Sequence, residues 1–380
     1  MNDLFAIIRE TKAFKCEKQN QIGETREMNK VTIRDVAALA GVSISTVSRV
    51  FNNNPKVDPV MAEKVRAAAA QINYRPAVVR PAPGERTGRI ACIVPALENT
   101  YYSSITSGII DTARKYGQSV IVMTTDSDRD VEEECFRSVT GGAVDGIIFA
   151  SSNSMDPIAR FPALRDIPMV IAARSRLTDG VPHVYADNEE AGYIAAKYLL
   201  RLNRRRIALF LSFWDRSIRS AEQFEELHAG GRRGAFTAFE RFDGYRRALE
   251  EEGVEYDPRM LVFSGYGFED GYRDAQKLLT GAVDFDAVLT PNDRMAAGVL
   301  KLFNEQQLKC PEQISMVCFN GGLLSRVTVP TMTVVRQDNY DLGVKAVEQL
   351  NKVIEGEKAE NIKLSVSLYI QGSTAQKPEP

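Results

Sequence analysis

The chain has little of what several common protein classes depend on. It holds only two histidines, His183 and His228, and neither has a nucleophile or metal-ligating neighbour at a telling spacing. Its five cysteines are odd in number and scattered, so they predict neither a disulfide framework nor a zinc site, and we expect a reducing, cytoplasmic compartment. No run approaches the roughly 18 consecutive apolar residues of a membrane span. A charged residue also ends the short N-terminal apolar stretch, which excludes a signal peptide.

The overall composition is that of a globular protein, with 380 residues, 44% of them hydrophobic and 26% charged. This length predicts two or three domains. The net charge of −2 is unevenly spread, because residues 28–80 hold eight Lys and Arg against three Asp and Glu. A small basic segment attached to a large acidic remainder is typical of a protein that binds a polyanion and has a second function elsewhere.

Three short helices are predicted near the N-terminus. Thr32 is placed to cap the first, Gly41 ends it, Ser43 caps the second, and Asp58 followed by proline begins the third. Residues 1–27 show no clean periodicity. We interpret them as an N-terminal extension and expect translation to begin at Met28.

Beyond a linker rich in proline and arginine (residues 76–88), the chain changes character. Short apolar runs recur, and stretches of helical length separate most of them. This alternation predicts an α/β fold with parallel sheets covered on both faces, in two lobes. The eight runs are residues 90–94, 120–123, 146–150, 169–172, 207–211, 260–263, 287–289 and 315–319.

The strongest pattern lies in residues 31–52. It predicts a helix, a glycine turn and a second helix with small hydroxylated residues on its exposed face. Small side chains let a helix sit deep in the major groove of DNA, and Arg49 near its end could read guanine or hold a phosphate. From the spacing alone, a plain helical hairpin with capping serines fits equally well.

The same residues resemble the DNA-binding head of the lactose-repressor/galactose-repressor (LacI/GalR) family of bacterial transcription regulators. The resemblance rests on Thr-Ile-Arg-Asp-Val-Ala (32–37), Ala-Gly-Val-Ser (40–43), Thr-Val-Ser-Arg-Val (46–50) and Asn-Tyr-Arg-Pro (73–76). It continues through segments that begin at residues 144, 167, 187, 292, 314 and 333. It implies a helix-turn-helix domain (28–75), a hinge linker (76–88) and a periplasmic-binding-protein-like body (89–375). The expected first lobe is about 89–187 plus 321–335, and the second about 188–320 plus 336–375.

The resemblance also implies a function. It predicts a homodimeric repressor that binds a pseudo-palindromic double-stranded DNA operator, with no membrane and no cofactor involved. The positions that match the family's base-reading residues are Ile44, Ser45 and Arg49. Those that match its phosphate contacts are Thr32, Ser43, Thr46 and Asn52.

The hinge departs from the family pattern. In the family this segment becomes a short helix on DNA, and a leucine from each subunit wedges into the minor groove. Here Pro83 stands at the leucine position and Pro81 two residues earlier. Since proline inside a helix costs about 3 kcal/mol, we expect an extended linker and less operator bending, with proline acting as the wedge as the alternative.

The resemblance places a small sugar-like effector in a cleft between the lobes, at the carboxyl ends of the strands. Each matching residue has a structural alternative: a packed aromatic for the tyrosine, a helix cap for the serine, ion pairs for the arginines and turns for the asparagines. These residues are Tyr101, Ser151, Arg174, Arg241, Asn292 and Asn320.

Two departures concern this cleft. Asn320 stands where the family usually has an aspartate, so with both arginines retained the cleft leans positive and an anionic sugar becomes more plausible. Residues 216–240 are longer than the family's usual connection, which predicts either a lid or partner surface at the cleft or a surface loop.

Two rival functions fit parts of the sequence. Gly265, Gly267 and Gly271 form a glycine pattern after an apolar run, but it comes too late in the chain for a dinucleotide fingerprint, so we expect these glycines to serve turns and helix packing and do not expect an enzyme. A solute-binding protein would suit the body alone. The helix-turn-helix and the lack of a signal peptide argue against it.

Overall fold

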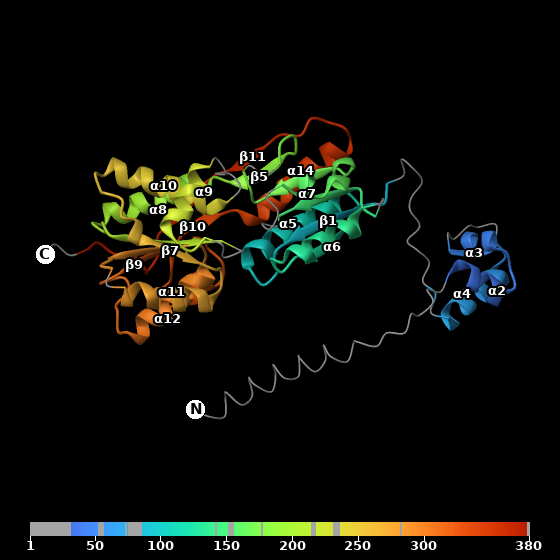
Figure 1. Ribbon diagram of the computed structural model, residues 1–380, viewed down its shortest axis with the longest axis horizontal. Helices are drawn as coiled ribbons and strands as arrows, with labels where there is room; N and C mark the ends of the chain where they lie inside the picture. The colour runs from blue at the N-terminus through green and yellow to red at the C-terminus, as the bar shows by residue number, and fades with distance from the viewer. Residues whose placement is uncertain are drawn as a thin grey trace, which may run out of the picture. The chain divides into compact units, whose positions relative to one another are not determined.

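The computed structural model describes residues 32–51, 57–72, 74, 86–140, 143–150, 156–175, 178–213, 218–230, 236–281 and 283–377. Its contacts divide the chain into two units, Met1–Arg80 and Pro81–Pro380, which are drawn in Figure 1. The predicted N-terminal extension and the start at Met28 lie outside the described residues.

The first unit contains the three predicted helices. They are α2 (Ile33–Ala40), α3 (Ile44–Phe51) and α4 (Pro59–Gln71). Gly41 ends α2 in the left-handed conformation at φ 65°, which a glycine adopts without strain. Asp58 caps α4 by accepting hydrogen bonds from the backbone N–H groups of Val60 and Met61. A small core of buried apolar side chains joins the helices, and its members are Val36, Ala37, Ala40, Val47, Val50, Val65, Ala68 and Ala69.

The second unit contains two six-stranded sheets. The first is wholly parallel, in the order β11-β5-β4-β3-β1-β2. Its strands are β1 (Arg89–Val94), β2 (Ser119–Thr124), β3 (Gly146–Phe149), β4 (Met169–Ala172), β5 (His183–Ala186) and β11 (Ile362–Leu364). The second has the order β12-β10-β9-β8-β6-β7, with only β12 antiparallel. Its strands are β6 (Ile207–Ser212), β7 (Leu261–Ser264), β8 (Ala287–Thr290), β9 (Ser315–Asn320), β10 (Thr333–Gln337) and β12 (Val366–Tyr369).

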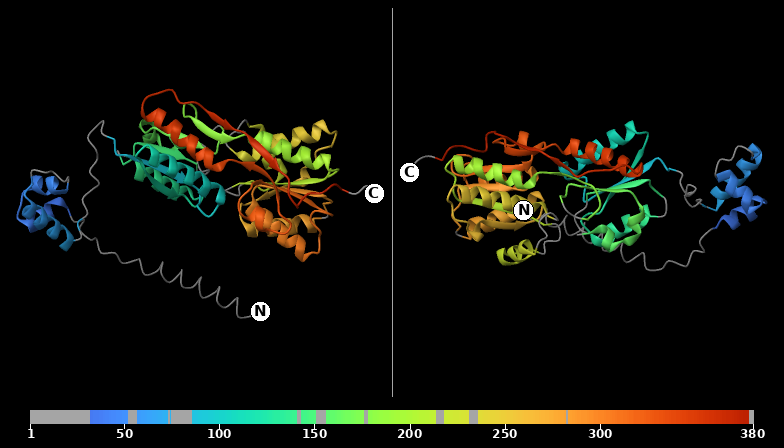
Figure 2. Two further views of the ribbon diagram at one scale, coloured as in Figure 1. Left: turned by 180° about the vertical axis from the view of Figure 1, so that it is seen from behind. Right: turned by 90° about the horizontal axis from the view of Figure 1, so that it is seen from above.

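Helices cover both faces of each sheet, as predicted, and Figures 1 and 2 show these layers. On the first sheet, α5 and α14 pack on one face and α6 on the other. On the second, α8, α9 and α10 pack on one face and α11 and α12 on the other. The helices are α5 (Thr100–Lys115), α6 (Arg129–Val139), α7 (Pro157–Arg160), α8 (Asn188–Arg201), α9 (Ala221–Ala229), α10 (Thr237–Glu251), α11 (Phe268–Thr280), α12 (Asp293–Glu305), α13 (Leu324–Val327) and α14 (Asn339–Ile354), with 3-10 turns at Pro162–Asp166 and Pro258–Met260.

Each of the eight apolar runs coincides with a strand to within a residue or two. The expected lobe boundaries, by contrast, are wrong near the C-terminus. The chain does leave the first lobe after β5, but β10 pairs with β9 in the second sheet rather than belonging to the first lobe. Helix α14 then packs on the first sheet through Leu342, Ala346 and Leu350. The later crossovers therefore follow β10 and β11, because each element goes to the sheet that buries its apolar face.

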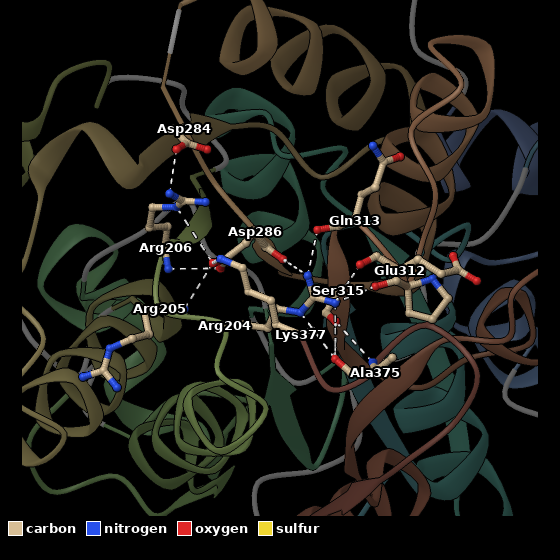
Figure 3. Close-up of polar contacts among 11 residues, drawn as sticks. Arg204, Arg205, Arg206, Asp284, Asp286, Glu312, Gln313, Ser315, Ala375 and Lys377 are labelled. Carbon is tan, nitrogen blue, oxygen red and sulfur yellow. Dashed lines mark hydrogen bonds and ion pairs between the residues drawn. The ribbon is translucent and has the colours of Figure 1, made fainter. Parts of the chain in front are cut away.

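One buried arginine fastens the C-terminal segment to the second sheet (Figure 3). Arg204 is 1% exposed. Its guanidinium donates to the carbonyl oxygens of Gln313 at 2.7 Å, Pro311 at 2.8 Å and Glu312 at 3.1 Å, and to that of Ala375 at 3.3 Å. Backbone carbonyls thus replace water around this cation.

Candidate functional site

Helix α3 presents the predicted DNA-reading residues to solvent. Val47 and Val50 are buried in the core of the first unit, whereas Ser45 and Arg49 are exposed and Ile44 is 46% exposed. Among the residues that the structure describes, Arg49 forms no hydrogen bond or ion pair. An apolar side chain and a free guanidinium therefore stand on the same outward-facing surface.

Hydroxyl side chains stand at the starts of α2 and α3. The Ser43 hydroxyl accepts from the Thr46 backbone N–H at 3.1 Å and lies 2.8 Å from the Thr46 hydroxyl. At the start of α2, the backbone N–H and hydroxyl of Thr32 both donate to the Asp35 carboxylate at 2.7 Å. These bonds lower the pKa of Asp35. The other three predicted contact positions, Asn52, Pro81 and Pro83, lie outside the described residues.

The second unit brings five predicted effector residues to one cavity. A space of about 40 Å³ is lined by Tyr101, Arg174, Arg241, Asn292 and Asn320 together with Asn99, Tyr102, Ala173, Thr237, Tyr266 and Pro291. The sixth predicted residue, Ser151, lies outside the described residues. Its neighbour is a larger groove of about 400 Å³ that shares Asn99, Tyr266 and Asn292 with the cavity. The site therefore combines side chains from both lobes.

Arg241 is held firmly in place on α10. It is 8% exposed, and its Nε donates to Asn188 Oδ1 at 3.2 Å while Nη1 donates to the Pro291 carbonyl at 3.1 Å. The guanidinium lies 4.2 Å from the centre of the Phe319 ring, a cation–π contact. The predicted alternative, an ion pair, is wrong for this residue among the described contacts.

Helix α10 is positioned by a close approach to α8. A Cβ added to Gly192 would lie 2.0 Å from the Arg241 carbonyl oxygen, and one added to Gly244 would lie 1.9 Å from the Glu189 carbonyl oxygen. Because both positions are glycine, the backbones of α8 and α10 can pack in direct contact. This close packing fixes the position of Arg241 at the cavity.

Arg174 follows β4 and enters the cavity from the first lobe. It is 6% exposed, and its guanidinium lies 5.8 Å from the centre of the Phe236 ring. Within the described residues it makes no hydrogen bond and no ion pair, so the predicted alternative of a surface ion pair is wrong here too.

The two asparagines differ in what holds them. Asn292 caps α12, since its Oδ1 accepts from the Met295 backbone N–H at 2.7 Å while its Nδ2 donates to the Tyr266 carbonyl at 3.2 Å. Asn320 has a left-handed backbone at φ 79°, and its buried Oδ1 has no partner in the described parts of the chain. Asn320 is therefore the better placed of the two to bind a ligand.

Sequence reasoning missed Glu240 beside Arg241. This half-buried carboxyl on α10 accepts a hydrogen bond from the Ser175 hydroxyl of the first lobe. Burial raises the pKa of Glu240 to about 7, although Ser175 and Arg241 act in the opposite direction. Asn188 was missed as well. Its place directly after Asp187, in a segment that carries the resemblance, was the available signal.

The predicted insertion contains a packed helix in its described part. Phe224 on α9 is fully buried among Phe213, Phe239 and Phe242. The Asp243 carboxylate accepts a hydrogen bond from His228 Nε2 at 2.8 Å. Residues 218–230 are thus joined to the second lobe through an aromatic cluster rather than forming a loop on its surface.

The glycine pattern of the rival enzyme prediction serves packing, as expected. A Cβ on Gly271 would lie 2.3 Å from the Met295 carbonyl oxygen, where α11 meets α12. Across the described ranges there is no cluster of three potential metal ligands, and no helix there is long and apolar enough to cross a membrane.

The chain matches two family models. Residues 32–77 match the model described as bacterial regulatory proteins, lacI family. Residues 87–372 match the model described as periplasmic binding proteins and sugar binding domain of LacI family. The second match alone covers well over half of the chain.

Individual proteins are similar over almost the whole chain. Catabolite control protein A of Priestia megaterium is 30% identical, covering 87% of this chain and 95% of that protein. The transcriptional regulator DegA of Bacillus subtilis is 29% identical, covering 91% and 98%. The solved lac repressor dimer, bound to operator and the anti-inducer ONPF, has a TM-score of 0.65 at 25% identity and covers 91% of this chain and 100% of its own. A complex of the regulator CelR with cellobiose has a TM-score of 0.64 at 25% identity, covering 90% and 99%. Head, body and relatives agree, and the chain belongs to the LacI family of bacterial transcription regulators.

Proposed function

We propose that this chain is a cytoplasmic, dimeric repressor without catalytic activity, whose affinity for its operator is set by a small sugar-like effector. The observation that carries the proposal is the buried cavity at which Tyr101 and Arg174 of the first lobe meet Arg241 and Asn320 of the second. The solved relatives support it, one bound to operator DNA and one to cellobiose.

The head is proposed to bind one operator half-site. Ile44, Ser45 and Arg49 read base edges, with Ile44 limited to apolar contact such as a thymine methyl group. Thr32, Ser43, Thr46 and Asn52 hold phosphates. We propose residues 28–75 as this head, 76–88 as the hinge and 89–375 as the body.

The effector is proposed to act by shifting a conformational equilibrium. A ligand that contacts both lobes favours the arrangement of the lobes that brings its partners together. The hinge passes this change to the two heads of the dimer and alters their spacing. The expected coupling between effector and operator is about 1–3 kcal/mol, or roughly 5- to 150-fold in affinity.

A gel-shift titration tests the proposal. Purified full-length protein is mixed with promoter fragments from its own locus at low ionic strength, with and without sugars, sugar acids and sugar phosphates. We expect nanomolar binding to at least one fragment, a change in affinity with one ligand class, and a dimer by light scattering. If the protein binds none of the fragments under any of these conditions, the proposed function is wrong.

A further inference from the structure

Arg174 places a cation in the cavity, and no described side chain forms an ion pair with it. Arg174 is 6% exposed and, within the described part of the molecule, has no hydrogen-bonding or ion-pairing partner. Burying an unpaired guanidinium is expensive, so proteins rarely do it without a compensating group. The ring of Phe236, 5.8 Å away, offers only weak compensation.

The residues that line the cavity around Arg174 carry no opposite charge, although Glu240, outside this lining, interacts electrostatically with Arg174 and Arg241. None of the side chains that line the small cavity is a carboxylate, and a second guanidinium, that of Arg241, lines it as well. Two nitrogens of Arg241 donate hydrogen bonds, Nε to Asn188 and Nη1 to the Pro291 carbonyl. Its third nitrogen, Nη2, has no hydrogen bond in the described structure. Two guanidinium groups that line one small cavity without a carboxylate favour an anionic group of the ligand, and the unpartnered Asn320 Oδ1 offers an acceptor beside them.

The adjoining groove has the opposite character. Four carboxylates, those of Glu98, Asp126, Asp270 and Asp293, line it. Carboxylates accept hydrogen bonds from hydroxyl groups but repel a second anion. The inner cavity of about 40 Å³ has room for a group of a few atoms, whereas the groove of about 400 Å³ admits a body of sugar size.

We propose that the effector is a polyhydroxylated anion, a sugar acid or a sugar monophosphate, whose charged group enters the inner cavity against Arg174 and Arg241. Its hydroxyl groups lie in the outer groove. This inference rests on the proposed function, since it names the ligand class of the same site.

The first test needs no knowledge of the effector. Arg174→Gln removes the unpaired charge and Arg165→Gln removes an exposed one. If Arg174 is kept for an anion, the ligand-free Arg174→Gln protein melts at the same temperature as the parent or a few degrees higher. A Tm lowered by several degrees in Arg174→Gln but not in Arg165→Gln would show a structural guanidinium and overturn the inference.

The second test uses minimal anions. Inorganic phosphate and acetate are titrated up to 100 mM against constant ionic strength, and Tm is followed. Saturable stabilisation is expected in the parent and in Arg165→Gln, and none in Arg174→Gln. A larger rise in Tm with phosphate indicates an effector with a phosphoryl group, and a larger rise with acetate indicates one with a carboxylate. Stabilisation by neither anion, or equal stabilisation in Arg174→Gln, overturns the inference.

Operator binding of the same preparations separates the two proposals. If the parent protein binds DNA but anions do not stabilise it through Arg174, the proposed function stands and the anionic effector is wrong. If anions stabilise the protein through Arg174 but it binds no promoter fragment, the proposed function is wrong and the anion site stands. Glucose, gluconate and glucose 6-phosphate then compare matched neutral and anionic sugars, and a shift in operator affinity with glucose alone also counts against an anionic effector.

Discussion

Ser175 donates its hydroxyl hydrogen to the carboxylate of Glu240, and this bond joins the two lobes beside the cavity. Ser175 lies three residues after β4 in the first lobe, whereas Glu240 belongs to the first turn of α10 in the second. The contact sits next to Arg174 and Arg241 in sequence, so the protonation of one carboxyl bears on both the closure and the charge of the cleft.

Stability is expected to depend on pH through Glu240. Its native pKa of about 7 lies above the ordinary value of 4.5, so the folded state holds the proton more tightly than the unfolded state does. The free energy of unfolding therefore falls as the pH rises from about 4.5 to about 7, by at most about 3 kcal/mol, and this dependence ends above that range. Urea midpoints at pH 5 and pH 8 should differ less in Glu240→Gln than in the parent. The exposed Glu357→Gln variant should behave as the parent does, and an unchanged pH dependence in Glu240→Gln would argue against the shifted pKa.

Gly192→Ala should both destabilise the body and weaken effector binding. The new methyl group would meet the Arg241 carbonyl at 2.0 Å, so α10 has to move and take Arg241 with it. Overpacking of this kind costs about 1–3 kcal/mol. Thermal unfolding and effector titration measure the two effects. Gly230→Ala is the control, because its Cβ meets nothing closer than 3.4 Å, and equal behaviour of the two variants would contradict the argument.

This contact also marks what could be predicted from the sequence. The segment that begins at residue 187 and the position of Arg241 were both recognised there, and periodicity found α2, α3, α4 and eight of the twelve strands. The contact between Gly192 and the Arg241 backbone depends on how α8 packs on α10. No local sequence pattern predicts that packing. Strands β5 and β11 were missed because polar side chains, His183 and Lys363, interrupt their short apolar runs.

In the cleft, too, the sequence predicted which residues are present but not which other residues they contact. The residue types at its edge followed from the resemblance, but the absence of a carboxylate from the cavity lining around Arg174 and the inter-lobe partner of Glu240 depend on tertiary contacts. The crossover after β10 was misplaced for a related reason, because the choice of sheet is made by packing rather than by the strand itself.

Arg204→Gln should destabilise the body by more than about 3 kcal/mol. The substitution removes the donor from the part-buried hydrogen bonds to the carbonyls of Gln313, Pro311 and Glu312, and each such loss costs about 1–3 kcal/mol. The exposed side chain of neighbouring Arg205 donates one hydrogen bond among the described contacts, to the Glu252 carbonyl, so Arg205→Gln should cost less than about 1 kcal/mol. Chemical denaturation measures both, and comparable losses would contradict the role given to Arg204.

Arg49→Ala should weaken operator binding by about 1–3 kcal/mol and relax the preference at one base position. Its guanidinium is exposed on α3 and free of partners among the described residues, so the substitution should leave the Tm unchanged. Titration against a set of single-base operator variants reads both affinity and specificity. Arg165→Gln, in the body, controls for net charge, and unchanged affinity in Arg49→Ala would reject its proposed contact.

The hinge is expected to bend DNA less than a hinge with a leucine wedge does. Proline lacks a backbone N–H and clashes with the preceding helical turn, at a cost of about 3 kcal/mol inside a helix, so a regular helix through Pro81 and Pro83 is disfavoured. Without that helix an apolar side chain is not fixed in the minor groove, and the energy of unstacking a base step is not recovered. A circular-permutation gel should show a shallow bend with the parent protein. The double variant Pro81→Ala, Pro83→Leu, which restores both helix-forming capacity and the wedge, should deepen it. A sharp central kink with the parent protein would instead mean that proline itself acts as the wedge.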